Sequence, residues 1–168
     1  CYSNEVEYIR TTIKQSNAYA SNVIEAFDNG NNVAVYPQNN RLADQLKVVA
    51  NLISGGLGTK IYIVNLGGFD THANQVLIGE PENGDHATLL KNVSDAVASF
   101  MEDCSALGIQ ERVVGMTFSE FGRQIKANNS FGTDHGTAAP LIVFGSCVNQ
   151  GVYGQNPEIT ANIAPQEG

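Results

Sequence analysis

Apolar and polar positions along this 168-residue chain follow two patterns, one typical of helices and one typical of buried strands. In the helical pattern, apolar residues recur every three or four positions and so share one face. This pattern covers residues 4–28, 40–54 and about 86–107. In the other pattern, apolar residues are continuous over a short run, as in strands buried on both faces of a parallel sheet. Such runs cover residues 61–66, 112–118 and 141–145, and residues 33–36 form a short strand or a link.

Turn residues separate these segments. Gly55 and Gly56 follow the second predicted helix, Gly108 follows the third, and Asp85 is a suitable N-cap for the third helix. The tail from Asn149 is polar and turn-rich, and we expect it to lie along the surface. Because helices and strands alternate, the pattern predicts one α/β domain over residues 1–168, with a mainly parallel sheet flanked by helices.

Composition narrows the classes of function. The chain is 42% hydrophobic and 15% charged, and its length is sufficient for one domain with a sizeable core. A formal net charge of −8 argues against nucleic acid and anionic lipid as partners. Apolar runs fall short of the ~20 residues that a membrane-spanning helix needs. The sequence starts at Cys1 rather than at a methionine, so we expect a processed end or a fragment boundary.

The three cysteines are too few and too scattered to indicate a disulfide framework, and none lies in a CxxC motif. A zinc site made of thiolates is therefore not expected. Cys104 falls on the apolar stripe of the third predicted helix, where a buried thiol is the ordinary expectation. Cys147 follows a predicted strand and is either packed or paired, and the pairing of Cys1 is left open.

Polar side chains with metal-binding chemistry collect at the ends of the predicted strands. Asp70 and His72 follow the strand at 61–66, Glu120 follows the next strand, and Asp134 and His135 precede the last one. Because ligands bind at the carboxyl edge of parallel sheets, these side chains are expected to converge there. Carboxylate oxygens and imidazole nitrogens favour a divalent ion. Zinc is the favoured ion, with manganese, iron, calcium and magnesium as alternatives.

Each of these residues also has a purely structural interpretation. Asp70 and Asp134 could cap turns, since aspartate side chains bond to nearby backbone groups. His72 could simply pack, and His135 could bond to backbone in its loop. Glu120 could be an exposed acid at the end of a strand.

Two further residues lie close to these positions in the sequence. Arg123 could pair with Glu120, or its guanidinium could bind a phosphate or sulfate group. His86 is an additional candidate metal ligand, but beside Asp85 at a helix start it could equally belong to the cap region.

Three blocks, GGFDTH, SEFGR and GTDHGTAAP, resemble the bacterial family called domain of unknown function 1501. The resemblance covers most of the chain. That family is similar to the alkaline phosphatase and sulfatase superfamily, which implies an alkaline phosphatase-like α/β fold, here only its C-terminal part. It also implies metal ligands at Asp70, His72, Glu120 and His135, and export to the periplasm or the extracellular space.

The resemblance implies a metal-dependent hydrolase that acts on small phosphate or sulfate esters, including phosphorylated or sulfated glycans. Two positions depart from the superfamily pattern. Glu120 and Phe121 stand where Asp-His is common, and no early strand carries a nucleophile. A missing N-terminal portion of the same protein is therefore an expected partner. The alternative is an exported binding or structural protein that kept the fold and lost the chemistry.

Overall fold

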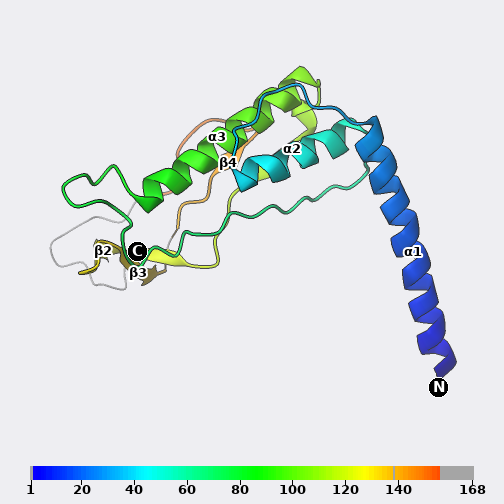
Figure 1. Ribbon diagram of the computed structural model, residues 1–168, viewed down its shortest axis with the longest axis horizontal. Coiled ribbons are helices and arrows are strands. Elements are labelled where there is room, and N and C mark those ends of the chain that lie inside the picture. Colours follow the sequence, from blue (N-terminus) through cyan, green and yellow to red (C-terminus); the bar gives the residue numbers. More distant parts are fainter. Residues whose placement is uncertain (1, 138, 156–168) are drawn as a thin grey trace.

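The computed structural model describes residues 2–137 and 139–155. Its helices are α1 (Tyr2–Asn29), α2 (Arg41–Ser54) and α3 (Asp85–Ala106), followed by a short 3-10 helix, η1 (Gln110–Arg112). Helices α2 and α3 lie side by side, whereas α1 extends away from them (Figure 1). Cys1 and most of the tail from Asn149 lie outside the described residues, so the predictions made for them are untested.

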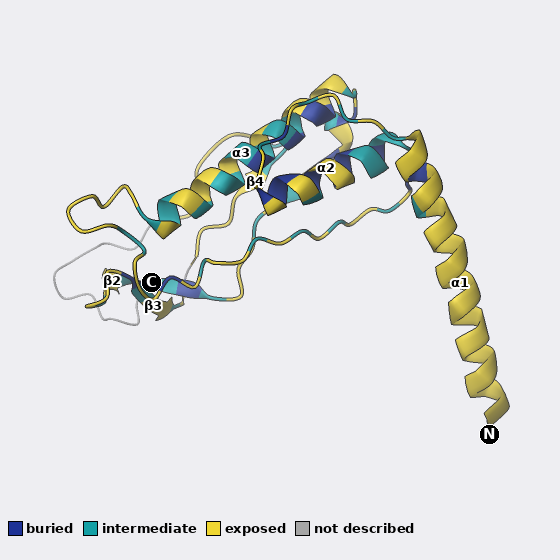
Figure 2. Ribbon diagram, viewed as in Figure 1, coloured by how far each residue is buried: buried dark blue, intermediate teal, exposed yellow. Residues whose placement is uncertain are grey.

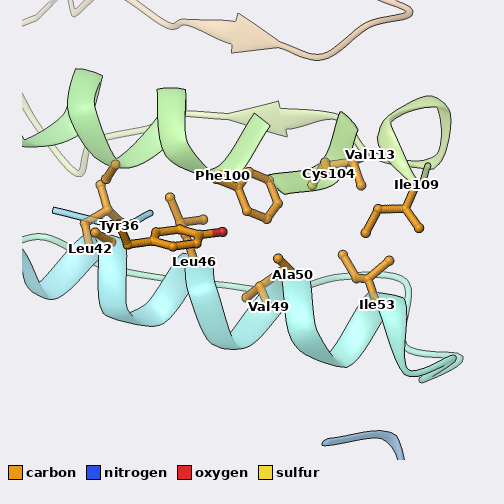
Figure 3. Packing of buried hydrophobic residues seen from close by; sticks show 12 residues of the cluster. Tyr36, Leu42, Leu46, Val49, Ala50, Ile53, Phe100, Cys104, Ile109 and Val113 are labelled. Carbon is orange, nitrogen blue, oxygen red and sulfur yellow. The ribbon is translucent and has the colours of Figure 1, made fainter. Parts of the chain in front are cut away.

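Helix α2 forms where the sequence predicts it, because both its start and its apolar face are locally specified. The Asn40 side chain accepts hydrogen bonds from the backbone N–H groups of Leu42 and Ala43, which otherwise lack partners at a helix start. Its buried face packs against Phe100 and Cys104 of α3 (Figure 3). Figure 3 shows these α2 residues at the interface: Leu42, Leu46, Val49, Ala50 and Ile53.

The prediction of a mainly parallel, alkaline phosphatase-like α/β sheet is wrong. The strands among the described residues form two small antiparallel pairs. In one pair β1 (Gly115–Met116) bonds to β4 (Val143–Phe144), and in the other β2 (Gly122–Ala127) bonds to β3 (Thr133–Gly136). The second pair is a hairpin, so its strands must run in opposite directions.

The segment predicted as the central strand shows why the predicted parallel sheet does not form. Residues 61–66 belong to none of the hydrogen-bonded strand pairs in the described part of the chain. Tyr62, Val64 and Leu66 pack against the core, whereas Ile61 and Ile63 are each 78% exposed. A strand of a parallel sheet needs cover on both faces, and here only one face is covered. The continuous apolar run at residues 61–66 therefore does not mean that this segment is buried on both faces.

Other predictions were wrong in detail. The N-cap of α3 is Gly84 rather than Asp85, and it makes no side-chain cap bond. Residues 112–118 form only the two-residue strand β1, and residues 141–145 only β4. The segment around Asp134 and His135, predicted as a loop before a strand, is itself strand β3. In contrast, Cys104 is a buried free thiol as predicted, and Cys147 is free and exposed.

Asp103 is a fully buried acid that fixes the loop after α1, and the sequence analysis did not identify it. Its two carboxylate oxygens accept four hydrogen bonds, at 2.6–3.0 Å. The donors are Asn32 Nδ2, Val33 N, Ala34 N and Tyr36 Oη. Burial raises the pKa of Asp103, but these bonds outweigh burial and hold that pKa below its ordinary value. Asp103 is therefore an ionised anchor within the core.

The same surroundings make Cys104 chemically quiet. Burial, and secondarily the negative charge of Asp103, raise the pKa of the Cys104 thiol to about 11. A thiol with so high a pKa is a poor nucleophile at neutral pH.

None of the helices described here has the length and apolar character required to cross a bilayer.

Candidate metal centre

The candidate site forms where the hairpin of β2 and β3 docks on the segment that follows residues 61–66. The backbone N–H of Thr133 donates to the carbonyl of Thr71. Both threonine hydroxyls also donate to Gln75 Oε1, at 2.9 and 3.0 Å. Gly132 allows this approach, because a Cβ there would lie 2.3 Å from the backbone of His72. Docking therefore sets the DTH segment beside the DHG segment.

Three potential ligands meet at this junction. One ligand atom from each of Asp70, His72 and His135 lies within 4.8 Å of the other two. Asp70 Oδ1 is 3.0 Å from His72 Nε2 and 2.9 Å from His135 Nε2. Ligands of one tetrahedral zinc ion lie roughly 3.3–3.5 Å apart, so the spacing requires only small adjustment. All three side chains are exposed, so an ion can reach them from solvent.

Neighbouring residues hold the two imidazole rings. Asp134 Oδ1 lies 2.9 Å from His72 Nδ1, on the side of the ring away from Asp70. Asn128 Nδ2 donates both to Asp134 Oδ1 and to the His72 carbonyl. The ring of Phe121 stacks on His135, with centroids 4.0 Å apart and planes 8° apart. Such support fixes ring orientation, as is usual around metal-binding histidines.

Arg123 braces the same cluster from β2, directly opposite His135 in the β2–β3 register. Its guanidinium donates to the carbonyls of Phe69 and Thr133 and to Asp70 Oδ1, the last at 2.9 Å. It also lies over the ring of Phe121. These contacts direct several of its N–H groups toward Phe69, Asp70 and Thr133, and its ion pair is with Asp70 rather than with Glu120.

The carboxylates of the site remain ionised. A hydrogen bond from His135 is the largest influence lowering the pKa of Asp70, and the nearby charges of His72 and Arg123 lower it further. Hydrogen bonds from His72 and Asn128 likewise lower the pKa of Asp134. A carboxylate that stays deprotonated can bind a cation even in mildly acidic solution.

Three of the predicted ligands lie outside this cluster. Glu120 is exposed in the turn before β2, and its carboxylate is not among the grouped ligand atoms of the described chain. His86 lies in the first turn of α3, where its ring packs edge-on to Phe69. Asp134 contacts His72 rather than joining the three grouped ligands.

Sequence reasoning missed three supporting residues. Asn128 lies in an Asn-rich stretch that reads as an ordinary turn, and Gln75 lies in a polar loop. Phe121 directly follows Glu120, and its place within the SEFGR block was the feature of the sequence that could have identified it as part of the site. The hydroxyls of Thr71 and Thr133 both bond to Gln75, so neither is presented as a nucleophile.

Comparison with known proteins gives one result. The sequence model of a family described as "Protein of unknown function (DUF1501)" matches residues 45–167. That range contains Asp70, His72 and His135, and it begins within α2. No curated protein and no solved structure matches the chain.

Proposed function

Because this chain belongs to the DUF1501 family of proteins of unknown function, we propose a function from its own geometry. Asp70, His72 and His135 bind one divalent metal ion, and zinc is the favoured ion. The observation that supports this most strongly is the meeting of one carboxylate oxygen and two imidazole nitrogens within 4.8 Å. Two imidazoles and one carboxylate match a known ligand set of catalytic zinc sites.

The chemistry of the donor set fits such an ion. The pKa of Asp70 is lowered, so its oxygen is available as an anion. When His72 donates a hydrogen bond from Nδ1–H to Asp134, the lone pair of Nε2 points toward Asp70, and a cation between them relieves the repulsion. A bound ion would supply Lewis-acid polarisation of an ester oxygen and a lower pKa for a coordinated water.

The reaction class in this proposal rests on the sequence blocks. They resemble the family described above, and its similarity to alkaline phosphatases and sulfatases supports hydrolysis of small phosphate or sulfate esters, including those on glycans, by an exported protein. Within the described residues, the chain supplies the metal-binding part: Asp134 and Asn128 orient His72, Phe121 orients His135 and Arg123 holds Asp70. No hydroxyl among the described residues is assigned as the nucleophile.

Titration of zinc and manganese into the chain, followed by assays on aryl phosphate and aryl sulfate, tests this function. We expect stoichiometric binding of one ion, and little or no ester hydrolysis by this chain alone. Failure to bind either ion would favour a second function, a binding or structural protein. The bonds of Asp70 to Arg123 and of Asp134 to His72 would then serve only to hold the hairpin in place.

The bond between Asp134 and His72 gives a separate prediction. In Asp134→Asn the carboxylate that orients His72 becomes a neutral amide, so we expect zinc affinity to fall by about 10–100-fold. The fold should be retained, because Asp134 is exposed. Asp95→Asn, on α3, where the carboxylate pairs with Lys91, is the control and should leave zinc affinity unchanged. Equal affinities in the two variants would show that Asp134 does not position His72.

A further inference from the structure

Helix α1 is the least covered element of the molecule. Of its 28 residues, all within the described range, only Ala26 is classed as buried. It extends away from α2 and α3, and its surface is exposed along nearly its whole length (Figures 1 and 2). At 1.5 Å per residue it is about 42 Å long. It also lies outside the residues that the family model matches.

The exposed residues of α1 follow a heptad repeat. Positions separated alternately by four and three residues carry apolar side chains, with Ser16 as the exception. These positions are Tyr2, Val6, Ile9, Ile13, Ser16, Ala20, Val23 and Phe27. Tyr2, Val6, Ile9 and Ile13 are between 44% and 87% exposed. An average spacing of 3.5 residues, sustained over the whole helix, indicates a coiled-coil seam rather than a face packed on a globular core.

The charged residues beside this seam are arranged as expected for a parallel pair of identical helices. In heptad terms Val6, Ile13, Ala20 and Phe27 take position a, and Tyr2, Ile9, Ser16 and Val23 take position d. Glu5 then takes position g, and Arg10 takes position e of the next heptad. In a parallel coiled coil of two identical helices, g of one helix faces this e of the other. Glu5 and Arg10 therefore form two opposite-charge pairs, one on each side of the dimer.

The other features of α1 agree with this arrangement. β-branched Val6 and Ile13 at position a favour two strands. Its contacts with the rest of the chain lie in its C-terminal half: Tyr19 Oη lies 2.9 Å from Thr59 Oγ1, and the backbone of Ala26 lies against Gly55. Tyr19 and Ala26 both occupy position g, beside the seam, so the seam is uncovered from Tyr2 to Ser16.

Helix stability provides a further reason for a partner. Helices in proteins are stabilised mainly by packing of their apolar face, and the exposed middle of α1 contains Thr11 and Thr12, which are weak helix formers. We propose that α1 forms a parallel two-stranded coiled coil with α1 of a second copy of this chain. The chain is then a dimer, held at a site separate from the candidate metal centre.

Sedimentation equilibrium of the full chain across a wide concentration range tests this proposal. We expect wild type to have the mass of two copies. In Ile9→Asp/Ile13→Asp, two carboxylates enter the seam from each helix, and the dissociation constant should rise by at least ~100-fold. The matched control is Thr11→Asp/Gln15→Asp, which adds the same charge on the outer face and should leave the dimer intact. A wild-type monomer, or equal dimerisation of both variants, would overturn the proposal.

Two further variants test the seam and its register without disrupting the fold. Ser16→Leu fills the polar position of the seam and should lower the dissociation constant by ~10-fold or more. Glu5→Arg alone should raise it by about 3–10-fold, and adding Arg10→Glu should restore it. An unchanged dissociation constant in Ser16→Leu would contradict the seam. If the charge-reversed pair does not restore the wild-type constant, the parallel register is wrong. Circular dichroism confirms that each variant is folded.

Discussion

We expect the zinc affinity of this chain to fall by more than ~100-fold when His135 or His72 is replaced by alanine. Losing a residue that merely supports a metal ligand already lowers metal affinity by about 10–100-fold. Each substitution removes one of the three grouped ligand atoms and leaves a site with two. Binding in the wild type should also weaken on acidification, because protons compete with the ion for imidazole nitrogen. Calorimetric titration of zinc and manganese measures both effects.

The chain contains its own matched control. His86 is the third histidine of the sequence, and it lies outside the grouped ligands. His86→Ala should therefore bind zinc as wild type does. If all three alanine variants keep wild-type affinity, Asp70, His72 and His135 do not form a metal site. Loss of binding only in His86→Ala would place the site elsewhere on the chain.

The second large effect is expected on stability, at Asp103. Asp103→Ala leaves its four donors without their acceptor inside the core, and we expect the free energy of unfolding to fall by about 3–5 kcal/mol. Burial raises the pKa of Tyr36, so its hydroxyl stays protonated and still needs an acceptor, which the variant lacks. Urea denaturation measures the difference. Glu102→Ala, an exposed neighbour on α3, should change stability by no more than about 0.5 kcal/mol.

The pH dependence of stability follows from the same residue. The pKa of Asp103 is lower in the folded chain than its ordinary value of 3.8. Its contribution to stability is therefore fully present above that value and is lost as pH falls through the folded pKa. Wild type should lose stability steeply below about pH 4, and Asp103→Asn should lose less over the same interval. Parallel pH curves for the two proteins would show that Asp103 is not an ionised anchor.

The sequence by itself determined the helices and identified the candidate ligands. The apolar spacing and Asn40 specify α2 locally, so its predicted limits and its observed limits nearly coincide. The GGFDTH and GTDHGTAAP blocks likewise named Asp70, His72 and His135 as candidate ligands. These features depend on residues a few positions apart, and periodicity or short motifs report such relations directly.

Only the tertiary structure decided which segments pair and which polar groups meet. Residues 61–66 carry a strand-like pattern, yet pairing depends on neighbours distant in sequence, and Ile61 and Ile63 remain exposed. No local pattern in the sequence marks Asp103 as buried, yet in the folded chain it accepts hydrogen bonds from four donors in residues 32–36. His135 meets Asp70, 65 positions away, because the hairpin docks through Thr71 and Thr133. Contacts between residues so far apart in the sequence depend on the fold of the whole chain, and patterns within a few neighbouring residues do not predict them.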